Sequence, residues 1–277
     1  MSLFLCPVCG ASLAHAGGSY RCAAGHTFDV AKAGYVHLLP VRKKHAASPG
    51  DNREMVAART AFLDGGYYAH LAEALAEEIE TNFTANDVCT FLDSGCGEGY
   101  YTQAICNHLS AKNRDVSVYG IDISKEALRR AARRLPQGKF AVASAYHLPI
   151  ADNAADVLLN CFSPMCDTEF VRVLKNGAFF YYVVPAARHL WQLKEVLYAN
   201  PYENETKVVT YPNLRYIKTL HTTAERHFPT QEAIEALFAM TPYAYRTPSE
   251  GRARLATLDT LTCTCAFDIH VYRCEKN

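Results

Sequence analysis

The feature of this sequence that most restricts its fold is a glycine-rich segment that directly follows a short apolar run. Residues 88–92 combine β-branched and aromatic side chains, which is typical of a buried strand. Asp93 comes next, and glycine then occupies every second position at Gly95, Gly97 and Gly99. Glycines at such a place let the backbone pass close to a ligand at the start of a helix. The segment therefore predicts a strand, a ligand-binding loop and a helix, in that order.

A second strand is predicted further on, in the segment 116–124, and it ends at Asp122. An acidic side chain at the end of the second strand can accept hydrogen bonds from both hydroxyls of a ribose. The glycines follow a G-x-G-x-G spacing and not the G-x-G-x-x-G fingerprint of dinucleotide-binding domains. With Asp93 in front, the segment resembles the first motif of class I S-adenosylmethionine-dependent methyltransferases. A nicotinamide-binding Rossmann domain and a purely structural turn are the alternatives.

Strands and helices alternate along the rest of the chain. Further strands are predicted at 140–144, 155–161, 176–185 and 263–274, and helices at 67–80, 99–110, 124–135, 167–174 and 230–240. This order predicts an α/β, Rossmann-like fold with a doubly wound, mostly parallel sheet, and with ligands bound at the carboxyl ends of the strands.

Two loops of such a methyltransferase fold supply further candidates. The loop after the third strand would flank an adenine, which places Ala145, Tyr146 and His147 there. The end of the fourth strand, near Asn160, would face a methyl group. Ordinary loop surface explains Tyr146 and His147 equally well.

Three cysteines and a histidine near the N-terminus have the spacing of a zinc site. Cys6 and Cys9 form a C-x-x-C pair, and Cys22 and His26 form a second pair twelve residues later. Zinc prefers four such ligands in a tetrahedron, and a site filled entirely by protein is structural. A module this small needs the metal to hold its fold. A redox C-x-x-C motif and chance spacing are the alternatives.

The cysteine content also bears on location. Eleven cysteines, an odd number spread unevenly, fit metal-bound and free thiols better than a secreted disulfide framework. No window reaches the roughly 18 apolar residues of a membrane span, and no secretory signal precedes the Cys/His pairs. We therefore expect a cytoplasmic protein that has no contact with a membrane.

Charge is balanced overall but uneven along the chain. The formal net charge is zero, which argues weakly against a non-specific nucleic-acid binder. Residues 1–53 nevertheless hold six Lys or Arg against two Asp, and three of the six lie in the stretch 41–45. A second basic row lies in the predicted helix 124–135, where residues four apart share a face: Arg129, Arg130, Arg133 and Arg134. Such rows are usually solvated, and a phosphate contact is the alternative.

Over nearly its full length the chain resembles the bacterial 23S rRNA (guanine-N1)-methyltransferases with an N-terminal zinc-binding module. The segments that carry the resemblance are CPVCG…YRCAAGHTFDVAKAGYVHLLP (6–40), PGDNREMVAARTAFLDGGYY (49–68), LDSGCGEGYYT (92–102), PAARHLWQLKEVLY (185–198) and MTPYAYR (240–246). The resemblance implies S-adenosylmethionine-dependent methylation of N1 of a guanine in a hairpin loop of 23S rRNA. It also implies a zinc module that helps to hold the RNA, and a homodimer.

The resemblance carries individual site residues as well. Tyr68 and His189 are implied as cofactor contacts, although a core position for Tyr68 and a surface position for His189 are the plainer interpretations. The implied zinc ligands are Cys6, Cys9, Cys22 and His26. The full set of cofactor candidates is Tyr68, Asp93, Gly95, Gly97, Glu98, Asp122, Ala145, Tyr146, Asn160 and His189.

The target base is expected near the segment 160–170, which follows the family's aromatic-small-proline pattern only loosely. A guanine splayed out of its loop would stack on aromatic surface, for which Phe162 and Tyr101 are candidates. Loss of the N1 proton requires a general base or a water relay. Asp167 and Glu169 are candidate bases, but acidic side chains also favour the first turn of a helix.

We predict three parts in the chain: a zinc-binding RNA-recognition module at 1–40, a basic linker and helix at 41–66, and the methyltransferase domain at 67–277. The segment 199–227, rich in Asn and Tyr, is a candidate contact with RNA or a partner subunit. A methyltransferase of small molecules with a purely structural zinc site is one alternative function. A non-enzymatic RNA-binding protein is another, against which the intact glycines and Asp122 argue.

Overall fold

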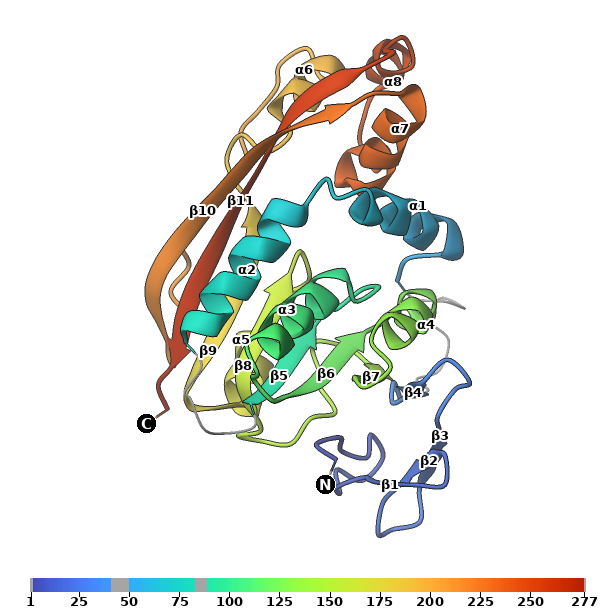
Figure 1. Ribbon diagram of the computed structural model, residues 1–277, viewed down its shortest axis with the longest axis vertical. Helices are drawn as coiled ribbons and strands as arrows, with labels where there is room; N and C mark the ends of the chain where they lie inside the picture. The colour runs from blue at the N-terminus through green and yellow to red at the C-terminus, as the bar shows by residue number, and fades with distance from the viewer. Residues whose placement is uncertain (1, 41–49, 83–88, 277) are drawn as a thin grey trace.

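A single eight-stranded sheet forms the body of the protein (Figure 1). The computed structural model describes residues 2–40, 50–82 and 89–276. The strand order is β10-β11-β9-β8-β5-β6-β7-β4, in which β10, β11 and β9 pair antiparallel and the other neighbours pair parallel. The strands are β4 (Tyr35–His37), β5 (Cys89–Ser94), β6 (Val116–Asp122), β7 (Lys139–Val142), β8 (Ala155–Cys161), β9 (Leu174–Pro185), β10 (Leu214–Phe228) and β11 (Leu261–Cys274).

Helices cover the sheet in the order that the sequence predicts. The predicted helices overlap α2, α3, α4, α5 and α7, and the predicted strands overlap β5 to β9 and β11, so the mostly parallel α/β fold is confirmed. Val88 of the first predicted strand lies outside the described residues. The helices are α1 (Arg53–Asp64), α2 (Ala69–Thr81), α3 (Tyr100–Ala111), α4 (Lys125–Arg134), α5 (Asp167–Val173), α6 (Trp191–Leu197), α7 (Gln231–Met240), α8 (Ser249–Leu255) and the 3-10 turn η1 (Pro242–Tyr245).

Two hydrophobic cores form because successive residues of each strand face opposite sides of the sheet. In β5, Phe91 packs in one core and the next residue, Leu92, packs in the other. In β6, Val118 and Tyr119 divide in the same way. Such burial on both faces explains the continuous apolar runs that identify these strands in the sequence.

The part of the chain after β9 builds a region that the sequence analysis identifies only in part. The 15-residue strand β10 runs along β11 from Leu214 to Phe228 as an edge of the sheet. Most of its side chains are exposed or half-buried, so it lacks the apolar run of an inner strand. Figure 1 shows α6, α7 and α8 gathered around the far end of these two long strands. The segment 199–227, which we predict to contact RNA or a partner, thus contributes most of an edge strand.

The N-terminal module is joined to the large sheet. Its own three-stranded sheet consists of β1 (Ala14–Ala16), β2 (Ser19–Arg21) and β3 (Thr27–Asp29). Gly17 and Gly18, with positive φ angles, make the turn between β1 and β2. The following strand β4 pairs in parallel with β7 of the large sheet. The predicted module 1–40 therefore supplies one strand, β4, to the large sheet.

Candidate metal centre and active-site pocket

The four predicted zinc ligands lie together. The ligand atoms of Cys6, Cys9, Cys22 and His26 all lie within 4.8 Å of one another. His26 Nδ1 is 3.5 Å from the Cys6 sulfur and 3.3 Å from the Cys22 sulfur, and the Cys9 and Cys22 sulfurs are 3.8 Å apart. Four zinc ligands with bonds of about 2.0 to 2.3 Å have neighbours about 3.3 to 3.8 Å apart in a tetrahedron. The donor set and its spacing fit one structural zinc ion.

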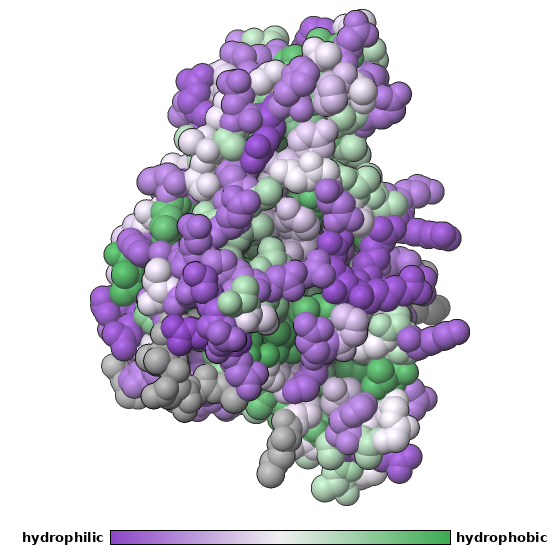
Figure 2. Space-filling view, in the orientation of Figure 1, coloured by the Kyte–Doolittle hydropathy of each residue, from purple (hydrophilic) through white to green (hydrophobic). Residues whose placement is uncertain are grey.

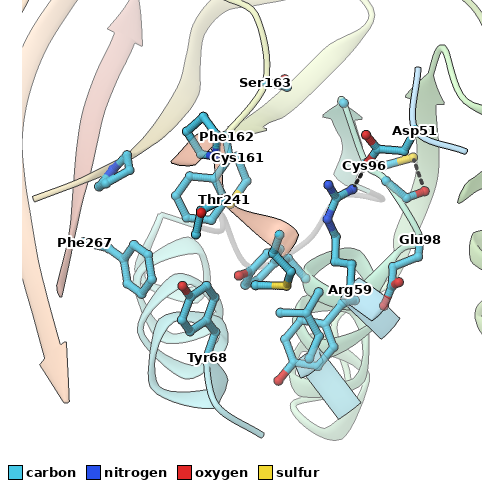
Figure 3. A pocket seen from close by; sticks show the side chains of 18 of the residues that line it. Asp51, Arg59, Tyr68, Cys96, Glu98, Cys161, Phe162, Ser163, Thr241 and Phe267 are labelled. Carbon is cyan, nitrogen blue, oxygen red and sulfur yellow. Dashed lines mark hydrogen bonds and ion pairs between the residues drawn. The ribbon is translucent and has the colours of Figure 1, made fainter. Parts of the chain in front are cut away.

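A pocket of about 550 Å³ opens at the carboxyl ends of the central strands (Figure 3). This is where open α/β sheets bind their ligands. Its walls come from the ends of β5, β6, β8 and β9, from α1, and from the 3-10 turn η1. Seven of the cofactor candidates line it: Tyr68, Asp93, Gly95, Gly97, Glu98, Asp122 and His189.

The glycine loop after β5 forms the floor of the pocket. Gly95, Gly97 and Gly99 all have positive φ angles, which favour glycine. A Cβ atom at Gly95 would lie 2.2 Å from the side chain of Ser163, so no larger residue fits there. A Cβ at Gly97 would meet no atom within 4 Å. The backbone at Gly97 therefore faces open space inside the pocket, where a ligand can approach it closely.

Asp93 is a buried carboxylate that lacks a complete set of partners. Thr102 Oγ1 donates a hydrogen bond of 2.6 Å to Asp93 Oδ2. Among the described residues, Oδ1 has no hydrogen-bond partner. Burial raises the pKa of Asp93 to about 7, and the bond from Thr102 opposes this rise. A cationic group next to Oδ1 would supply the partner that this carboxylate lacks.

Asp122 is held by backbone donors at the end of β6. Its Oδ2 accepts a hydrogen bond from the Gly97 N–H at 2.9 Å, and its Oδ1 accepts one from the Ser124 N–H at 2.8 Å. Burial raises the pKa of this carboxyl, and the two backbone bonds oppose the rise. Because each carboxylate oxygen has a second lone pair, Asp122 can still accept hydrogen bonds from ribose hydroxyls.

Tyr68 and His189 form a buried pair on another wall. His189 Nδ1 accepts the N–H of Ala266 at 3.2 Å, and its Nε2 lies 3.4 Å from the Tyr68 hydroxyl. Burial lowers the pKa of His189 to about 3, so the ring is neutral. With Nδ1 accepting, the ring proton sits on Nε2 and points to the Tyr68 oxygen. The Tyr68 hydroxyl is then free to donate a hydrogen bond into the pocket.

The Glu98 carboxylate is already engaged by protein groups. It accepts a hydrogen bond from Thr60 of α1 and forms an ion pair of 3.2 Å with Arg134 of α4. Asp51 and Arg59 form a second ion pair at the same side of the pocket (Figure 3). These contacts fix α1 and α4 to the glycine loop.

The remaining cofactor candidates do not line this pocket. Tyr146 is 53% exposed in the loop after β7, next to Ala145. Asn160 is fully buried, and its Nδ2 donates to the Pro164 carbonyl at 3.0 Å. Asn160 therefore stabilises the turn after β8. The cofactor contacts assigned to Ala145, Tyr146 and Asn160 stay predictions.

That turn presents an aromatic ring to the pocket. Phe162 has a φ of +55°, which strains a residue with a side chain, and its side chain is 45% exposed. Ser163 Oγ donates to the Ser94 carbonyl at 2.7 Å and thereby anchors the turn to β5. Tyr101, the other predicted stacking residue, is half-buried and also lines the pocket, with its ring 6.3 Å from that of Phe162. Both predicted stacking residues thus reach the pocket, and Phe162 is the more exposed of the two.

The two candidate bases lie in the first turn of α5 and outside the pocket lining. Glu169 accepts the Leu148 N–H at 2.7 Å and pairs with Arg172 at 2.8 Å. The side chain of Asp167 accepts the N–H of Thr168 at 2.9 Å. Their positions match the alternative given above, in which acidic side chains stabilise the first turn of a helix.

Part of the lining comes from residues to which the sequence assigns no role. The matched segments 49–68 and 240–246 contain some of them, and proximity in the fold is invisible in the sequence. The segment 199–227 contributes two more. These residues are Asp51, Arg59, Tyr202, Asn204, Thr241 and Tyr243.

Comparison with known proteins places this geometry in a family. Residues 4–47 match the family described as RlmA, N-terminal, a zinc ribbon, and residues 91–178 match a methyltransferase domain. The YxjB protein of Bacillus subtilis, named as a candidate 23S rRNA (guanine-N1)-methyltransferase, is 33% identical over 97% of this chain and 96% of its own length. The 23S rRNA (guanine(748)-N(1))-methyltransferase of Streptomyces fradiae is 39% identical over 69% of this chain and 66% of its own. The chain belongs to the 23S rRNA (guanine-N1)-methyltransferase family.

A solved structure confirms the fold of this family member. The YcgJ protein of Bacillus subtilis aligns with a TM-score of 0.50 at 16% identity, over 76% of this chain and all of that one. The chain thus has the class I fold of S-adenosylmethionine-dependent methyltransferases. Within the described residues, no helix has both the length and the apolar character needed to span a membrane.

The surface beside the pocket is basic. On α4, Arg129 and Arg133 are exposed, and Arg129 has only a contact of 3.3 Å to Glu126. Lys125 and Arg133 of the same helix form no ion pair within the described residues. In the orientation of Figure 1, Figure 2 shows hydrophilic side chains projecting from the edge where α4 lies. The basic stretch 41–45 lies outside the described residues.

Proposed function

We propose that this protein transfers a methyl group from S-adenosylmethionine to N1 of a guanine in a hairpin loop of 23S rRNA. The relatives that match over nearly the whole chain are named for this reaction. The observation that carries the proposal is that one pocket joins the glycine loop, a buried carboxylate with one oxygen unpartnered among the described residues, and an accessible aromatic ring. A decayed cofactor site would not keep these three features together.

The residues that line the pocket fit the chemical groups of S-adenosylmethionine. Asp93 would pair with the cofactor's ammonium, since its Oδ1 has no partner in the described part of the chain. Asp122 would accept the ribose hydroxyls, and the open backbone at Gly97 would lie against the cofactor. Tyr68, held by His189, would donate a hydrogen bond to it. When bound, S-adenosylmethionine supplies a methyl group on a positively charged sulfur.

Phe162 would hold the target guanine beside that methyl group. Bases splayed out of RNA loops stack on aromatic side chains, and the turn after β8 fixes this ring against the pocket. Orientation of the nucleophile is the largest contribution such a site makes to a methyl transfer. The strained backbone of Phe162 is consistent with such a functional constraint.

A methyl-transfer assay tests the proposal. Cofactor labelled on the methyl group is incubated with the protein and an unmodified 23S rRNA fragment that contains the hairpin. We expect label in the RNA, and no label when the hairpin is deleted. Cofactor binding without any transfer to RNA would contradict the proposal and favour a small-molecule substrate.

The zinc module and the row on α4 are proposed to hold the RNA backbone. We expect the double change Arg129→Glu and Arg133→Glu to weaken RNA binding about tenfold or more at low salt. The slope of the logarithm of the binding constant against the logarithm of the salt concentration should also decrease by about two, because two phosphate contacts are lost. Cofactor affinity should not change, since neither side chain lines the pocket.

A matched control has the same charge change at another place. Lys175→Glu with Arg273→Glu alters two cationic positions on the paired strands β9 and β11, outside the segment 199–227. Fluorescence anisotropy with a labelled hairpin compares the two double variants. Equal weakening by both pairs would show that only net charge matters and would contradict a specific role of α4.

The homodimer and the cytoplasmic location implied by the resemblance are part of this proposal. Light scattering after gel filtration measures the mass of the particle in solution. A mass of twice the 30.7 kDa chain is expected, and a mass of one chain would contradict the dimer.

A further inference from the structure

A buried lysine outside the predicted site lies against the pocket. Lys194 of α6 is fully buried. Its Nζ donates to the Tyr202 carbonyl at 2.7 Å and to Asn204 Oδ1 at 2.8 Å. The rings of Tyr202 and Tyr243 surround it, with centroids 4.5 and 5.6 Å from Nζ. No carboxylate in the described part of the chain lies within ion-pair distance of this ammonium.

All three partners of Lys194 are pocket residues. Tyr202, Asn204 and Tyr243 line the same pocket as the glycine loop. Asn204 is also anchored, because its Nδ2 donates to the Ala186 carbonyl at 2.8 Å. Lys194 therefore fixes one wall of the pocket and brings a positive charge behind it.

The charges around the pocket are divided between its walls. The carboxylates Asp93 and Asp122 come from the ends of β5 and β6, whereas Lys194 comes from α6. Figure 1 shows α6 beside the far end of the long strands β10 and β11, away from β5 and β6. Tyr202 and Asn204, which contact Lys194, nevertheless line the same pocket as the two carboxylates. A cationic ligand is favoured on the carboxylate side, and a group that becomes anionic is favoured on the lysine side.

We infer that Lys194 is a positioning residue that promotes loss of the N1 proton from the target guanine. The inference rests on the proposed function. The N1–H bond breaks and the proton passes to solvent, and the nitrogen electron pair forms the new bond to the methyl carbon. The carbon–sulfur bond breaks with its electron pair remaining on sulfur, which becomes a neutral thioether. A nearby buried cation stabilises the anionic nitrogen before this transfer.

Other charged and titratable groups near Lys194 leave its charge largely uncompensated. Glu203, whose charge acts on Lys194, is exposed and lies 3.6 Å from Arg188. His189 is neutral, and burial lowers the pKa of Lys194 itself. The remaining groups on the elements around α6 are aromatic hydroxyls, cations, thiols or exposed acids: Tyr198, Tyr202, Tyr243, Arg252, Arg254, Cys263, Cys265, Glu195 and Glu250.

The pH dependence of the methyl-transfer step tests this inference. Single-turnover rates on the 23S rRNA fragment are measured between pH 6 and 9.5 for the wild type and for Lys194→Met. We expect the apparent pKa of the rate to rise by about one unit in the variant, because the loss of a buried cation disfavours the anionic form of the base. The rate at pH 7 should fall about tenfold and recover at high pH.

Two further variants distinguish an effect of the Lys194 charge on the pH profile from an effect of the shape of the pocket wall. Asn204→Asp keeps the hydrogen bond to Lys194 but neutralises its charge, so it should shift the pH profile in the same direction. Lys218→Met, on β10, removes a cation that pairs with Glu78 away from the pocket, and it should keep the wild-type profile.

Unchanged profiles in both Lys194→Met and Asn204→Asp, whatever their absolute rates, would overturn the inference. If Lys194→Met does not fold, Asn204→Asp alone decides. A wild type that methylates no RNA would instead overturn the proposed function, so the two failures are distinct.

Discussion

Asp93→Asn is expected to abolish tight cofactor binding while making the protein more stable at pH 8. The carboxylate is buried, and its Oδ1 has no partner within the described residues. We expect the cofactor affinity to fall about 100-fold or more, because removing one member of a buried charge pair costs about 3 kcal/mol or more. Asparagine keeps an acceptor for Thr102, so local geometry is preserved. Isothermal titration calorimetry measures the loss.

The stability of this variant should depend on pH in a defined direction. The pKa of Asp93 is raised to about 7 in the folded protein, above the unfolded value of about 3.9. The stability that the protonated form provides is complete below pH 4 and is lost as pH rises to about 7. The melting temperature of Asp93→Asn relative to the wild type should therefore increase between pH 4 and 7. A parallel pH dependence of both proteins would contradict this.

The affinity of the wild-type protein for the cofactor should also depend on pH through the ionisation of Asp93. A cationic ligand binds the ionised carboxylate, so affinity should rise about fivefold between pH 6 and pH 7 for a group with a pKa near 7. The Asp93→Asn variant should show no such rise. If the variant binds the cofactor as the wild type does, Asp93 does not meet the ligand.

Cys22→Ser is expected to unfold the N-terminal module and to release its zinc. Structural zinc contributes about 10 kcal/mol or more to the folding of small modules. Cys22 lies in the same hydrophobic cluster as Phe4 and Tyr119, so the adjoining face of the sheet should lose stability too. Cofactor binding should persist, because no residue in the described range 2–40 lines the pocket. Methylation of the RNA should fall at least about tenfold, since RNA contacts of the module are lost.

Metal analysis and calorimetry check this expectation. The wild type should contain one zinc per chain, and the variant should contain none. Cys166→Ser is the matched control, because Cys166 is a half-buried thiol outside the cluster. A Cys22→Ser protein with full zinc content would show that the four residues do not share one ion. Full methylation without zinc would limit the module to a structural role.

Much of the fold can be predicted because its signals are local. Three signals each predict their structure from a few neighbouring residues. They are the apolar run before Asp93, the spacing of Gly95, Gly97 and Gly99, and the Cys/His pairs. The strand β10 cannot be found in this way, because its side chains face solvent as an edge strand and show no apolar run. The strand β4 is short and joins the large sheet only through a distant partner, β7.

The site can be predicted only where a motif marks it. The sequence predicts Asp93, Asp122 and the glycines as site residues because they come directly after predicted strands and before predicted helices. Lys194 does not, because its role depends on Tyr202 and Tyr243, which the chain brings together from different elements. The engagement of Glu98 by Thr60 and Arg134 is likewise a product of packing between α1 and α4.

The most direct test of the central claim is reverse transcription across an unmodified 23S rRNA fragment after incubation with the protein and S-adenosylmethionine. A methyl group on N1 blocks Watson–Crick pairing, so the transcript should stop next to one guanine of the hairpin. Asp93→Asn should give no stop. A methylated RNA without any stop would place the methyl group away from the pairing edge, and a stop at another base would name a different acceptor. Either result would contradict guanine-N1 methylation.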